Sequence, residues 1–178
     1  MIQAQDKDRE IFQRAWIVSD IQKAMRHWIE VRGIGPFFFS PRVPSQRALF
    51  LGRPASFEIS AAIAQAGDIQ IELIQQHVAT CPLFGDQVCP PQGDLHHIGV
   101  AVSDLDAIVE QYAALDLPPF FEDRFGETRY MFIDTRAQHG YLTEFIQSTP
   151  AFDRTRAMIR DAADRWNGDA PIRSFAQT

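Results

Sequence analysis

The sequence lacks the features that would assign the chain to a membrane, to nucleic acid or to the secretory pathway. No apolar run approaches the roughly 18 residues that span a bilayer, and residues 1–10 contain no apolar stretch typical of a signal peptide. No basic cluster offsets the net charge of -6, so a nucleic-acid surface is not expected. We therefore expect a cytoplasmic protein with neither nucleic-acid nor membrane partners.

Cysteines and phosphate-binding motifs are also scarce. Cys81 and Cys89 lie in a Pro-rich segment without CxxC spacing, and two cysteines do not form a disulfide framework, so reduced thiols are expected. No Gly-rich phosphate loop is present. The composition, with 46% hydrophobic and 22% charged residues, is that of a folded chain and not of a disordered one.

What the sequence does contain is an internal repeat. Residues 95–102 alternate as a strand does and run directly into a Ser-Asp helix cap, and residues 11–20 repeat this pattern. Matching positions lie 84 residues apart: Val18 and Val102, Ser19-Asp20 and Ser103-Asp104, Ile21 and Leu105, Met25 and Val109, Trp28 and Tyr112. Self-similarity at a fixed spacing indicates two copies of one structural unit.

Each copy is predicted to form a strand, a helix and then several strands. The first copy covers residues 11–76 and the second covers residues 95–148. Residues 77–94 are expected to link them, because this segment is rich in proline and carries turn residues. Residues 149–178 are expected to form a C-terminal helix and tail.

Four polar side chains occupy equivalent strand positions in the two copies. Gln13 is the counterpart of His97, because the two are separated by the same 84 residues. Glu72 is the counterpart of Glu144, because each begins a segment in which an apolar residue, Ile and Gln follow. Taken singly, each is an ordinary strand residue, but their recurrence in both copies favours a shared site.

Small residues accompany two of these positions. Ala15 lies two residues after Gln13, and Gly99 lies two residues after His97, on the same strand faces. This pattern leaves space beside the polar groups. The neighbouring His96 is expected to point to the opposite face from His97 and to have a structural role.

These four residue types predict a metal site. Two carboxylates on inward-facing strand positions are costly unless a positive charge joins them, and no lysine or arginine occupies an equivalent position. One imidazole nitrogen and three side-chain oxygens suit Zn, Mn, Co or Ni. The predicted ligands of this divalent metal ion are Gln13, Glu72, His97 and Glu144.

The repeat, the stretch from His97 to Leu105 and the two Glu-containing closing strands resemble the vicinal oxygen chelate superfamily, which includes glyoxalase I, methylmalonyl-CoA epimerase, bleomycin-resistance proteins and extradiol dioxygenases. The resemblance implies an α+β, glyoxalase-like fold in which two tandem βαβββ modules form a cup-shaped mixed sheet. It also implies one metal ligand from each opening and closing strand, at Gln13, Glu72, His97 and Glu144.

The resemblance further implies a divalent-metal-dependent isomerase, epimerase or lyase. Such an enzyme transfers a proton next to a carbonyl through a metal-stabilised enolate, here on a small-molecule carbonyl or thioester substrate. Glu144 is the first candidate for the catalytic base and Glu72 the second. The set Gln, Glu, His, Glu resembles glyoxalase I, whereas methylmalonyl-CoA epimerase typically has His and Gln at the positions of Gln13 and Glu72.

Two other functions within the superfamily stay open from the sequence. A metal-free binding protein of the bleomycin-resistance type would keep the doubled fold without needing four ligand-type side chains. An extradiol-type dioxygenase is less favoured, because Glu72 stands where a second histidine for Fe(II) would be expected. The sequence also leaves open whether the copies form one cup within a chain or across a homodimer.

Overall fold

A computed structural model describes residues 10–84 and 94–175. Within these ranges, no helix has both the length and the apolar character needed to cross a membrane. The elements, in chain order, are β1 (Ile11–Ile17), α1 (Ile21–Arg32), β2 (Phe37–Pro44), β3 (Leu49–Phe50), β4 (Arg53–Pro54), β5 (Phe57–Ala66), β6 (Ile69–Ala79), the 3₁₀ turn η2 (Pro82–Phe84), β7 (Leu95–Val102), α2 (Leu105–Ala113), β8 (Phe121–Phe125), β9 (Thr128–Ile133), α3 (Arg136–His139), β10 (Leu142–Gln147), α4 (Pro150–Asp164) and β11 (Ile172–Ser174).

The two opening strand–helix units begin with the same cap. The Asp20 carboxylate accepts a hydrogen bond from the backbone N–H of Lys23, and Asp104 accepts one from Ala107 in the same way. Each bond satisfies an N–H group that the first helical turn leaves without a partner. The helix α1 then ends at Gly33, whose left-handed φ of 62° is the conformation that glycine adopts without strain.

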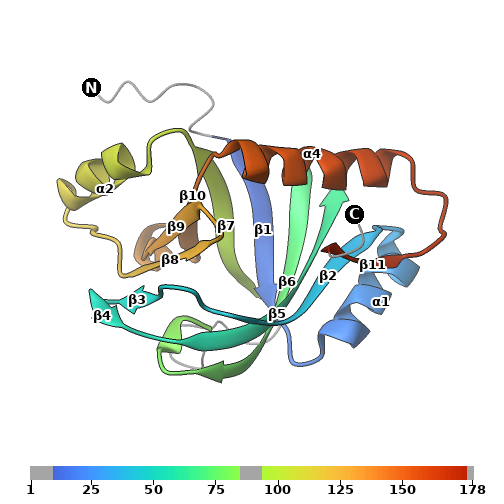
Figure 1. The fold of residues 1–178 in the computed structure, drawn as a ribbon, viewed down its shortest axis with the longest axis horizontal. Coiled ribbons are helices and arrows are strands. Elements are labelled where there is room, and N and C mark those ends of the chain that lie inside the picture. Colours follow the sequence, from blue (N-terminus) through green and yellow to red (C-terminus); the bar gives the residue numbers. More distant parts are fainter. Residues whose placement is uncertain (1–9, 85–93, 176–178) are drawn as a thin grey trace.

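The strand order shows the internal repeat directly. The first copy contributes β2-β5-β6-β1 and the second contributes β8-β9-β10-β7, and the antiparallel pair β1–β7 joins the two halves of one mixed sheet (Figure 1). In that pair Arg14 lies opposite Ile98, its own counterpart 84 residues later. The halves are therefore related by an approximate twofold axis between these residues. The α+β fold of two tandem βαβββ modules is confirmed.

One helix covers the outer face of each half-sheet. Ile21 of α1 packs with Ile71 and Leu73 of β6, and α2 packs in the same manner against a cluster that contains Phe145 of β10. Because side chains alternate along a strand, Glu72 is turned to the inner face of the sheet. Glu144, next to Phe145, is turned inward for the same reason.

Short strands close part of the inner face. The β3–β4 hairpin belongs to the first copy by sequence, yet Leu49 and Phe50 pair with β8 of the second copy. The helix α4 runs across the ends of β1 and β6 in Figure 1, and its Phe152 ring contacts the Phe12 ring at 5.7 Å between centroids. Both elements bring side chains over the inner face.

The segment expected to link the two copies contains ordered elements. The strand β6 continues to Ala79, and η2 follows it with Leu83 and Phe84 buried. The Cys81 thiol is also buried, and burial raises its pKa. Cys89 and the rest of the segment from 85 to 93 lie outside the described residues.

Candidate metal centre

Two neighbouring rows of the sheet carry the predicted ligands. In one row, Ala15 of β1 lies between Glu72 of β6 and His97 of β7. Adjacent strands are about 4.8 Å apart, so side chains on the outer two strands of such a row meet only over a small central residue. Because the side chain of Ala15 is only a methyl group, there is room above it, and Glu72 and His97 converge there.

The second row repeats this arrangement across the approximate twofold axis. Gly99 of β7 lies between Gln13 of β1 and Glu144 of β10. A methyl group at Gly99 would lie only 2.8 Å from Gln13 Oε1 and 3.2 Å from a ring carbon of Phe12. The side chain of Gln13 therefore lies directly over Gly99, and it fits there because Gly99 has no side chain.

Replacing Gly99 with alanine is expected to lower stability and to displace Gln13. The added methyl group would also lie 3.0 Å from Gln13 Cβ, which is too close for a buried contact. Overpacking of this kind costs about 1–3 kcal/mol. Thermal unfolding of Gly99→Ala measures the effect, with Ala101→Ser on the same strand as the control. Wild-type stability in Gly99→Ala would show that Gln13 does not occupy this space.

Three of the predicted ligands come together at one point. The Nε2 atom of His97 lies 3.3 Å from an oxygen of Glu72 and 3.3 Å from an oxygen of Glu144. The candidate ligand atoms of these three residues all lie within 4.8 Å of one another. Two atoms that each bind one Zn²⁺ ion at about 2.0–2.2 Å lie roughly 3–3.5 Å apart, so the two 3.3 Å distances from His97 Nε2 fit a shared ion.

An unsatisfied polar atom beside the site supports the same conclusion. Among the described residues, Gln13 Oε1 is buried without a hydrogen-bond partner, whereas the buried His97 Nε2 faces the two carboxylates at 3.3 Å. A buried polar atom without a partner is costly, and such atoms often mark a missing ion or water. The imidazole nitrogen and the three side-chain oxygens fit a divalent ion. Gln13 lies in the neighbouring row and stays the predicted fourth ligand.

The two carboxylates determine the charge of His97. Burial disfavours the charged imidazole, but Glu144 and Glu72 outweigh this effect and raise the pKa of His97 to about 9. Burial also raises the pKa of Glu144, although His97 opposes that shift. The metal-free site therefore holds at least one proton at neutral pH.

Metal binding is expected to release about one proton near pH 7. The pKa of His97 lies near 9, so the ring is protonated below that value and an ion must displace the proton to reach Nε2. Apparent affinity for Zn²⁺ should therefore rise with pH, by about tenfold per unit between pH 7 and 9. Calorimetric titrations in two buffers of different ionisation enthalpy measure the released proton. Heats that do not depend on the buffer would contradict this expectation.

The alternation of strand residues predicted that His96 points to the opposite face from His97, and this prediction is wrong. The pairing of Ala15 with His97 and of Trp16 with Leu95 leaves His96 as an extra residue in β7, which is a β-bulge. Both imidazoles are 1% exposed, and their Nδ1 atoms lie 2.8 Å apart. Burial, with a contribution from the charge of His97, lowers the pKa of His96 to about 3.

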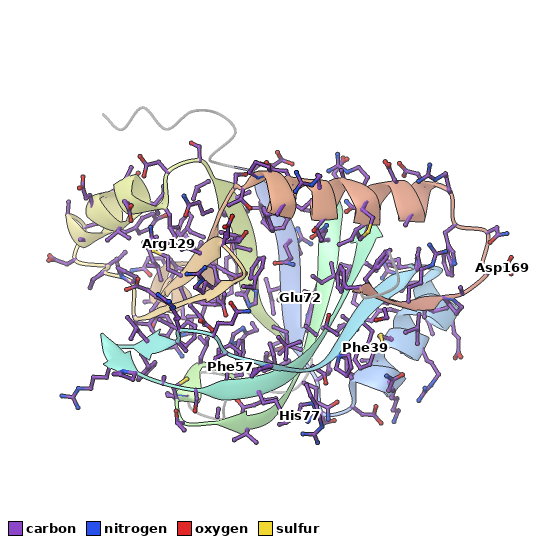
Figure 2. All side chains as sticks on the ribbon, viewed as in Figure 1. Phe39, Phe57, Glu72, His77, Arg129 and Asp169 are labelled. Atoms are coloured by element: carbon purple, nitrogen blue, oxygen red, sulfur yellow. The ribbon has the colours of Figure 1, made fainter. Side chains whose placement is uncertain are left out.

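A second group near the site also escaped sequence reasoning. The partly buried Tyr130 of β9 donates a hydrogen bond to Asp123 of β8 at 3.3 Å. Burial, together with the charge of Asp123, raises the pKa of Tyr130 well above its ordinary value, and the phenol is close enough for Glu144 and Glu72 to add to the shift. Tyr130 pairs with Ile146, which lies two residues after Glu144, so Tyr130 shares the inner face with the ligands. Glu72 is labelled near the centre of the molecule in Figure 2.

The doubled fold and this centre define a class of protein. The model of the Glyoxalase/Bleomycin resistance protein/Dioxygenase superfamily matches residues 12–132, which is more than half of the chain. The chain belongs to this superfamily, and the resemblance inferred from the sequence is confirmed. A comparison with curated protein sequences found no match.

Among solved structures, methylmalonyl-CoA epimerases share the fold. The Mycobacterium tuberculosis enzyme is 14% identical, with a TM-score of 0.56 over 86% of this chain and 97% of that one. A Streptomyces coelicolor epimerase variant in complex with 2-nitronate-propionyl-CoA is 16% identical, with a TM-score of 0.50 over 79% of this chain and 95% of that one. At these identities the likeness establishes the fold alone.

Proposed function

We propose that the chain is a divalent-metal-dependent enzyme that moves a proton on the carbon next to a carbonyl group. The observation that carries the proposal is the convergence of Glu72, His97 and Glu144, with Gln13 in the adjacent row. A bound Zn, Ni, Co or Mn ion would draw electron density from the carbonyl oxygen and so acidify the adjacent carbon. His97 would hold the ion through Nε2, and Gln13 would hold it through Oε1.

The two glutamates would supply the acid–base chemistry. They belong to opposite halves of the sheet, on either side of the approximate twofold axis, so each can address a different side of a bound substrate. Burial raises the pKa of Glu144, which brings its carboxyl group closer to the range that suits a general base. We therefore assign Glu144 as the first base and Glu72 as the second group.

Isomerase or epimerase chemistry on a carbonyl or thioester compound fits this arrangement. A related structure is a methylmalonyl-CoA epimerase with methylmalonyl-CoA bound, which is a thioester. The ligand set Gln, Glu, His, Glu keeps a glyoxalase-I-type lyase as an equally direct candidate. A cytoplasmic location and a homodimer stay predictions.

Solvent deuterium exchange tests the proposal. The metal-loaded protein is incubated in D₂O with a panel of 2-substituted acyl thioesters and hemithioacetals, and deuterium at the carbon next to the carbonyl is measured by mass spectrometry. We expect incorporation that is lost with a chelator and restored by the ion. A protein that takes up no stoichiometric divalent ion would instead favour a metal-free binding module. Oxygen uptake with catechols and Fe(II) would favour a dioxygenase.

A further inference from the structure

The inner face contains a second buried histidine that the proposed chemistry does not use. His96 Nε2 lies 2.9 Å from the carbonyl oxygen of Leu83, and His96 Nδ1 lies 2.8 Å from His97 Nδ1. His97 Nε2 is in turn 3.3 Å from both glutamates. One continuous chain of polar contacts therefore connects the η2 turn to the centre of the site.

The chemistry of the groups fixes the direction of each hydrogen bond. A backbone carbonyl only accepts, so His96 Nε2 carries the hydrogen that it donates to Leu83. The His96 ring is buried against Phe84 and Phe132, where an uncompensated positive charge would be costly, so the ring is neutral. A neutral imidazole protonated at Nε2 has a lone pair at Nδ1.

The same reasoning extends to His97. Because His96 Nδ1 accepts, His97 Nδ1 must donate across the 2.8 Å contact. When His97 is neutral, its lone pair is then at Nε2, the atom that faces Glu72 and Glu144. Phe132 also packs edge-on against His97, with ring centroids 5.0 Å apart, and limits rotation of the ring.

We propose that His96 is a positioning residue that holds His97 in the tautomer and orientation needed to bind the ion. This role rests on the proposed function, because it presupposes a metal at Nε2 of His97. The η2 turn takes part in this role, because the carbonyl oxygen of Leu83, which lies outside the two repeated units, holds His96 in place. Partners that orient a ligating histidine typically contribute about 10–100-fold to metal affinity.

Three substitutions separate this role from packing. His96→Asn places an amide oxygen near the position of Nδ1, where it can accept from His97. His96→Gln places its amide near Nε2, where it reaches Leu83 alone. His96→Leu fills the space with no polar group. His27→Leu, at an exposed position on α1, is the control for loss of an imidazole.

Zn²⁺ affinity is measured by competition with a chelator, and thermal unfolding checks that each variant folds. We expect His96→Leu and His96→Gln to bind Zn²⁺ about 10–100-fold more weakly than wild type, and His96→Asn to bind within about threefold of it. Nitrogen-15 NMR of the Zn-loaded wild-type protein should show His97 protonated at Nδ1.

The possible failures are distinguishable. Wild-type affinity in folded His96→Leu and His96→Gln would overturn the positioning role and leave the metal centre standing. Equal weakening in all three variants would assign His96 to packing alone, and would also overturn the role. A wild-type protein that binds no Zn²⁺, Ni²⁺, Co²⁺ or Mn²⁺ would overturn the proposed function and the positioning role with it.

Discussion

Replacing His97 with alanine is expected to abolish stoichiometric metal binding. The imidazole is the only nitrogen ligand of the predicted set, and it lies at 3.3 Å from both carboxylates. Its removal leaves two inward-facing carboxylates without the group that balances them. The loss of affinity should exceed the ~10–100-fold cost of removing an orienting partner. Metal content after dialysis, measured by elemental analysis, gives the result.

The control for this substitution is His27→Ala, which removes an exposed imidazole from α1. The control should retain one ion per chain. His97→Leu provides a second variant in case the alanine protein does not fold, because the leucine side chain refills part of the buried space and offers no ligand atom. A folded His97 variant that keeps its ion at wild-type affinity would remove His97 from the site.

Replacing Glu144 with glutamine is expected to remove proton exchange while the ion stays bound. An amide oxygen can replace a carboxylate oxygen as a ligand, as Gln13 is predicted to do, but an amide cannot accept the substrate proton. Loss of a general base typically slows a reaction by about 10²–10⁴-fold. The rate of deuterium incorporation, measured together with metal content, separates the two functions of Glu144.

Glu72→Gln is the matched variant from the other half of the sheet, and Glu30→Gln on α1 is the surface control. If Glu144 is the first base, exchange from one substrate enantiomer should survive in Glu72→Gln and fail in Glu144→Gln. Wild-type exchange in a metal-loaded Glu144→Gln protein would show that another group takes the proton.

The repeat made much of the site predictable from the sequence. The pairing of Gln13 with His97 and of Glu72 with Glu144 follows from fixed offsets, and the structure brings Glu72, His97 and Glu144 within 4.8 Å of one another. Two copies with the same sequence pattern pack in the same way, so side chains at equivalent positions point to the same side of the sheet. The small residue at position 99 was a further signal, since it marks where neighbouring side chains converge.

The position of His96 could not be predicted in the same way. Its direction depends on a β-bulge, and a bulge is determined by the register between β1 and β7 and not by the pattern of either strand. Because the bulge adds one residue to β7, strict alternation no longer gives the face of the sheet to which each side chain points. Tyr130 was missed because its hydrogen bond to Asp123 joins β9 to β8, and the pattern of neither strand alone specifies that contact.

The β3–β4 hairpin was missed for a different reason. Leu49 and Phe50 form a strand of two residues, which is too short to show any alternation. The hairpin is ordered by pairing with β8 of the other copy, which is a long-range contact. Part of the closure of the inner face therefore depends on tertiary structure alone.

Anomalous diffraction from crystals of the Zn-loaded protein tests the central claim most directly. The account predicts one peak at about 2.0–2.2 Å from His97 Nε2, Gln13 Oε1 and one oxygen each of Glu72 and Glu144. A peak elsewhere, or an ion that His97 does not contact, would contradict it.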